Sequence, residues 1–420
     1  MAENIIYYGP PGTGKTYILQ SIMNNYVDYG IADSDITGSY IIESTDWIPI
    51  AMVLLQNQGK MTTADIQKKL DSLYLGVSLD AAVILEKHSI EESLASINYR
   101  EQPRIFFPTN PGEWYVDLAR IISHRADFLD RFIKKKNIKK RYEFVTFHQS
   151  YAYEDFVEGI RPEYVPASNS IDYSPKDGVF KLLCERAINH PEKNYALFID
   201  EINRGNISEI FGELISLIEL DKRLGEAGAL EVKLPYSKTS LSIPRNISIY
   251  GTMNTTDRSL AQIDNALRRR FKFIAMTPST EVVEKELRLQ GIDSHNIGGV
   301  DLIKLINTLN ARIELLLDAE HLIGHAFFMK CKNIEDISNV ICHSVIPLLE
   351  EYFYDDLQKI QIIFSDLDED GNLRDTAIYK HSILRGSDFF PYTGDYLIED
   401  RKKFTAPKSI DKNSLLQIYS

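Results

Sequence analysis

The feature of this 420-residue sequence that most constrains its fold is the loop Gly9-Pro10-Pro11-Gly12-Thr13-Gly14-Lys15-Thr16. It fits the pattern G-x-x-x-x-G-K-[ST], with an apolar run, Ile5 to Tyr8, before it and a helix-like run, Thr16 to Tyr26, after it. Glycines let backbone N–H groups surround phosphate oxygens at a helix N-terminus, Lys15 adds a full positive charge, and Thr16 offers a hydroxyl to Mg²⁺. The loop therefore predicts a nucleoside-triphosphate site.

Composition limits the class of protein and its partners. The sequence is 44% hydrophobic and 25% charged, as in ordinary globular proteins, and is long enough for two or three domains. The net charge of −13 argues against binding nucleic acid through the overall field, so such a contact must be local or made through a partner. Cys184, Cys331 and Cys342 form no C-x-x-C pair, which predicts free thiols in a reducing cytoplasm. We see no signal peptide and no membrane span.

Residues 41–118 do not continue the nucleotide-binding pattern. The elements expected there are helices at 47–56, from Thr62 or Thr63, and at 89–97, and strands at 104–107 and 113–116. Three helices followed by a hairpin is the outline of a winged helix, which can read a DNA groove. Acidic residues outnumber basic ones there, which favours a protein-contacting or spacer role. Four residues keep DNA binding open at the wing: Tyr99, Arg100, Arg104 and Trp114.

A helix expected over Leu118–Phe132 leads into a basic run, Lys134 to Arg141. This run is either a solvated helix end, where cations complement the dipole, or a nucleic-acid patch. The next strand, Tyr142–Phe147, returns to the nucleotide-binding sheet. Residues 41–118 are therefore predicted to be an insertion between the first and second strands of the sheet.

An apolar strand that ends in two acids, Tyr195-Ala196-Leu197-Phe198-Ile199-Asp200-Glu201, supplies the second part of the site. A buried strand delivers Asp200 to the carboxyl edge of the sheet, where its carboxylate can hold the Mg²⁺ that Thr16 also contacts. Glu201 follows directly and can act as general base or orient the attacking water. With the loop, this acid pair predicts hydrolysis of the β–γ phosphoanhydride bond.

A hairpin-like piece is expected from Val232 to Ile243. The strand expected after it, Ile247–Gly251, leads to Met253-Asn254-Thr255-Thr256-Asp257-Arg258-Ser259. An amide at the tip of this strand can hydrogen-bond the γ-phosphate or the lytic water, and we assign that role to Asn254. The helix Leu260–Arg270 ends in Arg268, Arg269 and Arg270. Three arginines at a helix C-terminus can simply stabilise the helix dipole. In a chain with a phosphate site we favour instead an arginine finger that reaches a neighbouring subunit's nucleotide.

Together these motifs resemble the McrB family, the AAA+ GTPase subunits of modified-cytosine-specific restriction complexes. The segments that carry the resemblance are the phosphate loop, 147–156, 200–204, 253–259, 266–271, 323–328 and 347–353. The resemblance covers residues 1–30 and about 142–357. Its most specific stretch is Met-Asn-Thr-x-Asp-Arg.

The resemblance implies a homo-hexameric ring that binds GTP in place of ATP at subunit interfaces, with a McrC-like nuclease partner and translocation on DNA. It implies that Lys15 and Thr16 bind phosphate and metal. It gives Asp200 and Glu201 the metal and water roles and makes Asn254 the sensor.

For the remaining site residues the resemblance implies roles at the subunit interface. Asp257 belongs to the signature loop, and Asp264 with Arg268–Arg270 faces the next subunit's nucleotide. Arg269 is our choice of finger. His325 is either a lid sensor beside the nucleotide or a packed polar residue.

The chain also departs from the family. The family's well-known member has a DNA-binding domain ahead of the loop, whereas here only eight residues precede it, so the insertion is a candidate replacement. No N-K-x-D guanine-reading tetrapeptide occurs, which leaves the base open between GTP and ATP. Two rival hypotheses are an ATP-driven protein remodeller of the MoxR type and a nucleotide-switched DNA-binding scaffold.

The predicted fold is α/β: an AAA+ parallel-sheet core with a helical lid, an inserted winged-helix-like module and an irregular C-terminal extension. The expected boundaries are 1–40 and 119–278 for the core, 41–118 for the insertion, 279–360 for the lid and 361–420 for the extension. Within the lid we expect helical runs at Leu302–Leu316 and Ile337–Phe353. Asp366-x-Asp368-x-Asp370-Gly371 imitates the start of a calcium loop, but its twelfth position is Ala377 and not Glu. We therefore expect a hairpin turn there.

Overall fold

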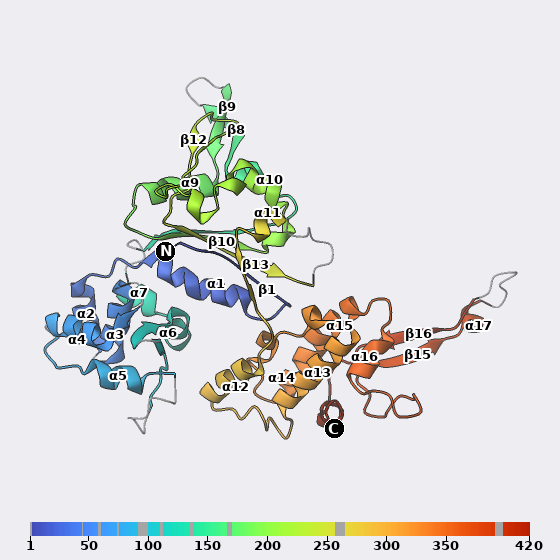
Figure 1. Ribbon diagram of the computed structural model, residues 1–420. Helices are drawn as coiled ribbons and strands as arrows, with labels where there is room; N and C mark the ends of the chain where they lie inside the picture. The colour runs from blue at the N-terminus through green and yellow to red at the C-terminus, as the bar shows by residue number, and fades with distance from the viewer. Residues whose placement is uncertain are drawn as a thin grey trace. The chain divides into compact units, whose positions relative to one another are not determined.

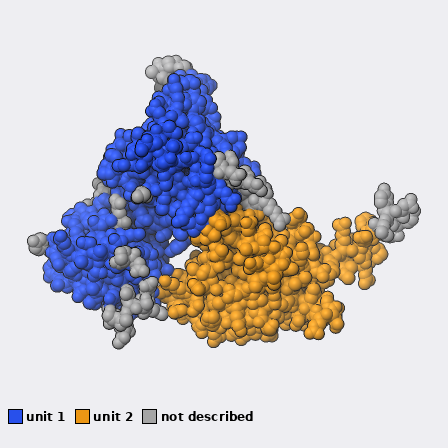
Figure 2. Space-filling model, in the orientation of Figure 1, with its two compact units in different colours: residues 1–7, 16–253, 260–274 blue, residues 8–15, 254–259, 275–420 orange. Residues whose placement is uncertain are grey.

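The computed structural model describes residues 2–43, 45–57, 60–73, 75–90, 100–109, 112–133, 138–165, 170–256, 265–390 and 398–420. The chain forms two compact units (Figure 2). Unit 1 holds residues 1–7, 16–253 and 260–274, and unit 2 holds residues 8–15, 254–259 and 275–420.

A five-stranded sheet with the order β14-β1-β13-β10-β7 forms the centre of unit 1. Its strands are β1 (Asn4–Gly9), β7 (Tyr142–Thr146), β10 (Tyr195–Asp200), β13 (Ile247–Asn254) and β14 (Lys272–Ala275). Strand β10 pairs in parallel with both β13 and β7, so that Ile199 lies opposite Gly251 and Val145. The predicted α/β class and the return of the chain to the sheet at Tyr142 are confirmed.

Helices lie on both faces of this sheet, with α1 on one side and α9 and α10 on the other (Figure 1). Their bounds are α1 (Lys15–Met23), α8 (Tyr153–Phe156), α9 (Val179–Ile188), α10 (Ile207–Phe211) and α11 (Asn265–Arg268). Phe156 is fully buried, and its ring centroid lies 5.8, 5.1 and 4.8 Å from those of Phe147, Phe180 and Phe211. The aromatic residues of segment 147–156 thus build this core. Alanine in place of Phe156 would cost about 3–5 kcal/mol.

Two antiparallel ribbons extend from unit 1 beside α9 and α10 (Figure 1). They are β8 (Glu158–Val165) with β9 (Ser170–Asp177), and β11 (Val232–Lys233) with β12 (Ser240–Leu241). The second matches the hairpin-like piece expected from Val232 to Ile243. The first was not predicted; it contains Pro162 and Pro175, which a two-stranded ribbon tolerates.

The insertion has its own core around α3 (Trp47–Gln56), in which every residue from Trp47 to Leu55 is buried. Its other elements are β2 (Val27–Asp28), α2 (Asp33–Glu43), β3 (Met61–Thr62), α4 (Thr63–Ser72), α5 (Ala81–Lys87), β4 (Phe106–Thr109), β5 (Glu113–Val116), α6 (Leu118–His124), α7 (Phe128–Phe132) and β6 (Lys139–Lys140). Strands β3, β5 and β4 form a sheet in that order. The core spans Val27 to Ile133 and is therefore wider than the expected 41–118.

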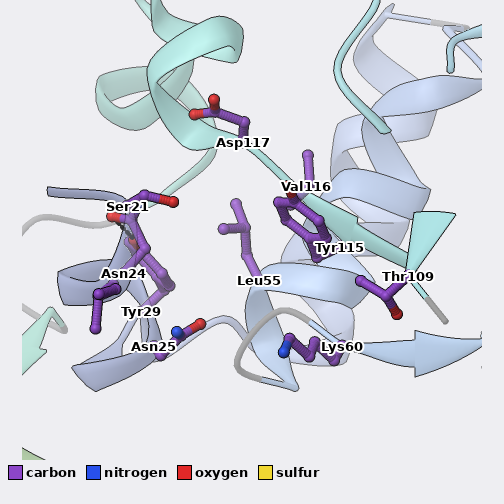
Figure 3. A pocket seen from close by; sticks show the side chains of 11 residues that line it. Ser21, Asn24, Asn25, Tyr29, Leu55, Lys60, Thr109, Tyr115, Val116 and Asp117 are labelled. Carbon is purple, nitrogen blue, oxygen red and sulfur yellow. Dashed lines mark hydrogen bonds between the residues drawn. The ribbon is translucent and has the colours of Figure 1, made fainter. Parts of the chain in front are cut away.

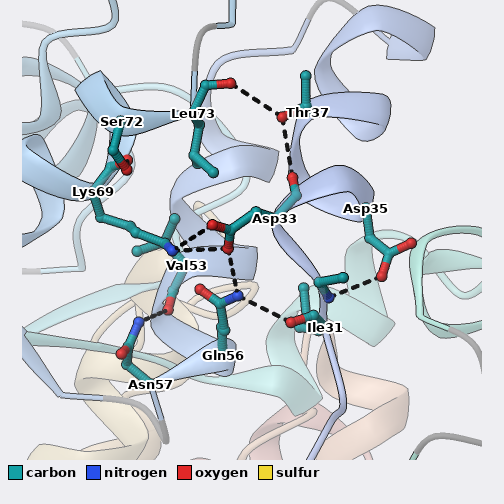
Figure 4. A network of polar contacts seen from close by, with 11 residues as sticks. Ile31, Asp33, Asp35, Thr37, Val53, Gln56, Asn57, Lys69, Ser72 and Leu73 are labelled. Atoms are coloured by element: carbon teal, nitrogen blue, oxygen red, sulfur yellow. Dashed lines mark hydrogen bonds and ion pairs between the residues drawn. The ribbon is translucent and has the colours of Figure 1, made fainter.

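Polar contacts join three helices of the insertion (Figure 4). Lys69 of α4 donates to Asp33 at the start of α2 at 2.8 Å, and Gln56 of α3 donates to the same carboxylate at 2.9 Å. The expected cap at Thr62 is confirmed, because its hydroxyl accepts the N–H of Asp65 at 3.2 Å. Helices α3 and α4 thus begin where the sequence predicted them.

Two expectations for this region were wrong, and a third falls mostly on residues that the structure does not describe. A helix that the sequence did not predict lies at Ala81–Lys87 and is capped by Asp80. Of the helix expected at 89–97, Ser89 forms a β-bridge with Phe106, and residues 91–97, like Tyr99, lie outside the described ones. The predicted helix over 118–132 is two helices, α6 and α7. Trp114 is buried and donates its indole N–H to Thr63 at 2.9 Å, so it is a core residue and no wing contact.

The basic run is described only in part. Residues 134–137 lie outside the described ones, Lys139–Lys140 form β6 on β2, and the buried Arg141 pairs with Asp28 at 3.0 Å. At least Arg141 is therefore a structural cation that holds the insertion to the sheet, and no part of a phosphate-binding patch. Lys193 binds the other oxygen of Asp28 at 2.9 Å. These contacts hold the pKa of Asp28 below its usual value, against the burial that raises it.

A cavity of about 250 Å³ lies where the insertion meets α1 (Figure 3). Asn25 follows α1, Leu55 and Lys60 come from the insertion's helical part, and Tyr115 and Asp117 come from β5 and the residue after it. Beside it the hydroxyl of Tyr17 in α1 donates to Asp117 at 3.2 Å. The insertion is thereby fixed to the helix that follows the phosphate loop.

Unit 2 is mainly helical, with the elements α12 (Thr280–Leu289), α13 (Leu302–Leu316), α14 (Ile334–Val340), α15 (Ile346–Tyr352), α16 (Gln358–Ile363), β15 (Lys380–Leu384), α17 (Gly386–Phe389), β16 (Arg401–Thr405) and α18 (Lys412–Gln417). The helix predicted at Leu302–Leu316 is confirmed. The run predicted at 337–353 is helical throughout, because a π-helical turn, Ile341–Val345, joins α14 to α15. The expected hairpin turn is confirmed, since Asp368 accepts two backbone N–H groups and Leu367 bridges to Leu373.

Asp366 is fully buried just before this turn and accepts the N–H groups of Ile378 at 2.7 Å and Tyr379 at 2.8 Å. Burial raises its pKa to about 6, although these hydrogen bonds favour the charged form. Asp366 thus belongs to the core of unit 2.

All three cysteines, Cys184, Cys331 and Cys342, are buried and free. Burial raises the pKa of Cys184 and of Cys331 to about 12 and also raises that of Cys342. Within the described ranges, no helix is long and apolar enough to cross a membrane.

Candidate functional site

The phosphate-binding loop has the backbone that its glycines predict. Gly9, Gly12 and Gly14 have φ values of +153°, +75° and +81°, a region that other residues rarely adopt. The ammonium group of Lys15 donates to the carbonyls of Gly9 at 2.8 Å and Pro10 at 2.6 Å. The positive charge is thus held within the loop.

The lid segment 324–327 packs directly on this loop within unit 2. The N–H of Ala326 donates to the carbonyl of Gly12 at 2.8 Å. A Cβ added to Gly324 would lie 2.1 Å from the carbonyl carbon of Gly12, and one added to Gly12 would lie 2.5 Å from the ring of Phe327. Glycine is therefore required on both sides of the contact.

His325 lies beside the loop and is buried. Its Nδ1 accepts the backbone N–H of Ser279 at 3.2 Å, which places the proton of the neutral ring on Nε2. The position that a Cβ of Gly14 would take lies 3.8 Å from that Nε2. Burial lowers the pKa of His325, so the imidazole is a neutral N–H donor at the loop. Of the two predicted readings, this arrangement favours the lid sensor.

In unit 1 a threonine bridges the two predicted acids. Asp200 is the last residue of β10, and Glu201 follows it. The hydroxyl of Thr252 in the neighbouring β13 donates to Asp200 Oδ1 and accepts the backbone N–H of Glu201 at 3.1 Å. Thr252 is 2% exposed. One buried hydroxyl therefore fixes both acids.

Glu201 has a left-handed backbone, with φ of 52° and ψ of 48°. A non-glycine residue in this region carries a cost of about 1–2 kcal/mol. The Thr252 hydrogen bond stabilises this conformation, and the side chain of Glu201 pairs with Arg204 at 3.4 Å. Strained backbones of this kind are concentrated at functional sites.

Asn254 is the last residue of β13, two residues after Thr252. Next to it, the N–H of Thr255 donates to the carbonyl of Gly9 at 3.3 Å, and its hydroxyl donates to the carbonyl of Glu320 at 3.2 Å. Along the chain, Asn254 thus lies between Thr252, which bonds to the acids, and Thr255, which bonds to the phosphate loop and the lid.

The three arginines at the end of α11 and just after it differ in environment. Arg270 has a 6% exposed side chain and pairs with Glu219 at 2.8 Å, whereas the side chain of Arg269 is 69% exposed and 3.9 Å from Glu219. Arg268 is also exposed. A buried arginine cannot reach a second subunit without leaving its pocket, so this geometry favours Arg268 and Arg269 over Arg270 as the finger. Asp257 and Asp264 lie outside the described residues.

Each unit by itself holds residues that fit one of the expected groups. In unit 2 the positive-φ glycines leave a backbone cradle without Cβ atoms and Lys15 supplies a cation, as a phosphate requires. In unit 1 Thr16 and Asp200 carry the hard oxygen ligands that Mg²⁺ prefers. Thr16 and Asp200 belong to unit 1, while Lys15, Asn254 and His325 belong to unit 2.

Sequence reasoning missed two features of the site. Thr252 belongs to no motif and lies just after the predicted strand Ile247–Gly251, so no sequence signal pointed to it. Gly324 and Ala326 lie in segment 323–328, for which the sequence offered only a resemblance to the McrB family. Their contact with the phosphate loop depends on tertiary packing.

Comparisons with known proteins agree with this geometry. The model of the McrB alpha-helical lid domain matches residues 301–361, and that of the AAA domain of the dynein-related subfamily matches residues 123–271. The chain is 35% identical over 322 residues to the type IV methyl-directed restriction enzyme EcoKMcrB subunit of Escherichia coli strain K12, covering 73% of this chain and 65% of that protein. It is 25% identical over 267 residues to the type II restriction enzyme BsuMI component YdiS of Bacillus subtilis strain 168, covering 54% and 75%. The chain thus spans just under two thirds of the E. coli relative.

Proposed function

Because the chain is a McrB-like AAA domain protein, we propose that it is the nucleotide-hydrolysing subunit of a modification-dependent restriction system. The E. coli relative is named as a subunit of a type IV methyl-directed restriction enzyme, and the B. subtilis relative as a component of a type II restriction enzyme. Both names support a role as one part of a DNA-directed enzyme.

In the proposed reaction, the loop N–H groups and Lys15 bind the β- and γ-phosphates of GTP or ATP. Thr16 and Asp200 would hold Mg²⁺, which neutralises charge on the phosphate oxygens when bound. Glu201 accepts a proton from the attacking water or orients it. Asn254 and the Nε2–H of His325 donate to phosphate oxygens, so the site responds to the γ-phosphate.

The assembly is part of the same proposal. The family resemblance favours GTP over ATP, a homo-hexameric ring, and a separate McrC-like nuclease subunit that stimulates hydrolysis. In that ring Arg269 serves as the finger and Asp257 and Asp264 lie near the interface. Three buried free thiols fit a reducing cytoplasm.

The observation that carries the proposal is the bridge by which Thr252 holds Asp200 and Glu201 together. Two acids that merely ended a strand would not need a buried hydroxyl. Here the Thr252 hydroxyl bonds both to the Asp200 carboxylate and to the backbone N–H of Glu201. Fixed acids at the carboxyl edge of a parallel sheet are what phosphoanhydride hydrolysis requires.

Hydrolysis of GTP and of ATP by the full chain tests the proposal, with and without the nuclease subunit. Glu201→Gln should lower turnover at least about 100-fold and leave nucleotide binding intact, because general-base catalysis contributes 10²–10⁴-fold. Glu209→Gln, an exposed acid of the same region, is the matched control. If wild type turns over neither nucleotide under any of these conditions, the proposal is wrong.

A further inference from the structure

A two-stranded ribbon beyond the matched lid extends from unit 2 (Figures 1 and 2). It consists of β15 (Lys380–Leu384) and β16 (Arg401–Thr405), paired antiparallel with Lys380 opposite Thr405 and Leu384 opposite Arg401. These two strands contain four Lys or Arg residues and no Asp or Glu, in a chain whose net charge is −13. The ribbon is therefore a local reversal of the overall charge.

One face of the ribbon packs on unit 2. His381 lies 2.9 Å from the side chain of Gln361 in α16, Phe404 stacks on Tyr379 at 5.6 Å, and Lys402 donates to the side-chain oxygen of Gln358 at 2.9 Å. This face orients the ribbon and leaves the other face exposed.

The opposite face carries three exposed cations, Lys380, Arg401 and Lys403, with Ser382 between them. In the part of the chain that the structure describes, none of the three has a carboxylate within ion-pairing distance. Arg401 and Lys403 are two residues apart on one strand, about 6.8 Å, so their side chains can reach neighbouring phosphates of one nucleic-acid strand. The face thus presents cations at a spacing that suits a phosphate backbone.

The end of the ribbon adds apolar surface to this charge. Phe389 is 64% exposed and Phe390 is 52% exposed, and together with Leu384 and Ile398 they line an open concavity of about 480 Å³. Glu399 also lines it, while Asp400 accepts the N–H of Gly386 at 3.0 Å. Cations followed by exposed aromatic rings are typical of surfaces that bind phosphates and contact bases.

We propose that the exposed face of the β15–β16 ribbon binds the phosphate backbone of duplex DNA. Lys380, Arg401 and Lys403 contact phosphates, and Phe389 and Phe390 contact bases or sugars beside them. A two-stranded ribbon has the width that a DNA groove admits. The inference rests on the proposed function only in taking DNA as the substrate, and it assigns the contact to this ribbon and not to the insertion.

The test is the salt dependence of DNA binding by the full chain, followed by fluorescence anisotropy on a 30-bp duplex between 50 and 200 mM NaCl. Lys380→Gln/Arg401→Gln/Lys403→Gln should weaken binding about tenfold or more at 100 mM salt. Each lost phosphate contact lowers the slope of log K against log salt by about 0.9, so the slope should fall by about 2.7. Phe389→Ser/Phe390→Ser should weaken binding with the slope unchanged.

The matched control is Lys285→Gln/Lys304→Gln/Lys330→Gln, which makes the same charge change at exposed lysines of unit 2. Equal losses for ribbon and control variants, or absence of DNA binding by wild type at 50 mM salt, would overturn the inference. So would loss of nuclease-subunit binding with DNA binding intact. Hydrolysis without DNA is measured in parallel, so failure of the motor and failure of the ribbon are distinguished.

Discussion

Replacing Thr252 by valine removes one hydroxyl from the acid pair and keeps the shape of a β-branched side chain. The N–H of Glu201 then loses its acceptor in a buried position, which costs about 1–3 kcal/mol. The left-handed backbone of Glu201 also loses the bond that stabilises it, so its carboxylate moves. A displacement of about 1 Å at a catalytic group costs about 100-fold in rate.

We therefore expect Thr252→Val to lower kcat about 100-fold and the free energy of unfolding by about 1–3 kcal/mol, with little change in KM for the nucleotide. The hydroxyl of Thr252 bonds to the acids, which act on the water and the metal, so nucleotide binding by the phosphate loop should survive. Steady-state hydrolysis and urea unfolding give the two quantities. Thr252→Ser keeps the hydroxyl and should restore most of the rate.

Ser248→Ala is the control for a general loss of stability. Ser248 lies on the same strand, is 4% exposed, and its hydroxyl accepts the N–H of Glu3 at 3.2 Å. This variant should lose stability but hydrolyse at the wild-type rate. Wild-type hydrolysis by Thr252→Val would refute the argument that this hydroxyl fixes the acids.

Three further sets of substitutions distinguish effects on nucleotide binding and hydrolysis from effects on stability. Gly324→Ala places a methyl group against the backbone of Gly12, so nucleotide affinity in a fluorescent-nucleotide titration should fall at least about tenfold, a loss of about 1.4 kcal/mol. The pKa of Asp366 is raised to about 6 in the folded state, so the protonated carboxyl stabilises the fold fully below about pH 4, and this stabilisation is lost as the pH rises to 6. In Asp366→Asn the free energy of unfolding should therefore change less with pH between about 4 and 6. Arg269→Ala should abolish stimulated hydrolysis with unchanged stability, whereas Arg270→Ala should lower the urea midpoint.

Each has its own control. Gly38→Ala in α2 meets no atom within 4 Å and should leave nucleotide affinity unchanged, so equal losses at both glycines would show that the loop contact is irrelevant. An unaltered slope in Asp366→Asn would assign the pH dependence to another group. Glu219→Gln should reproduce the stability loss of Arg270→Ala, because it removes the other half of the 2.8 Å pair.

The parts of the fold that the sequence predicted are those whose signal is local. Trp47–Gln56 and Leu302–Leu316 are periodic and were placed at their observed bounds. The phosphate loop and the acid pair carry motifs at fixed spacing, and both follow strands of one sheet.

The parts that were missed depend on tertiary context. Helix α5 was not predicted, although Asp80 caps it. Strands β8 and β9 were not predicted either, although their apolar residues alternate, and they pair only with each other. Thr252 has no distinguishing neighbour in the sequence, because its role comes from the pairing of β13 with β10.

The burial of all three thiols has a practical consequence. Reaction with maleimides requires an accessible thiolate, and burial raises the pKa of every cysteine here. The natural chain therefore already serves as a silent background for site-directed labelling. A single cysteine at Ser382 would carry a fluorophore between the cations of the ribbon and report its approach to DNA directly.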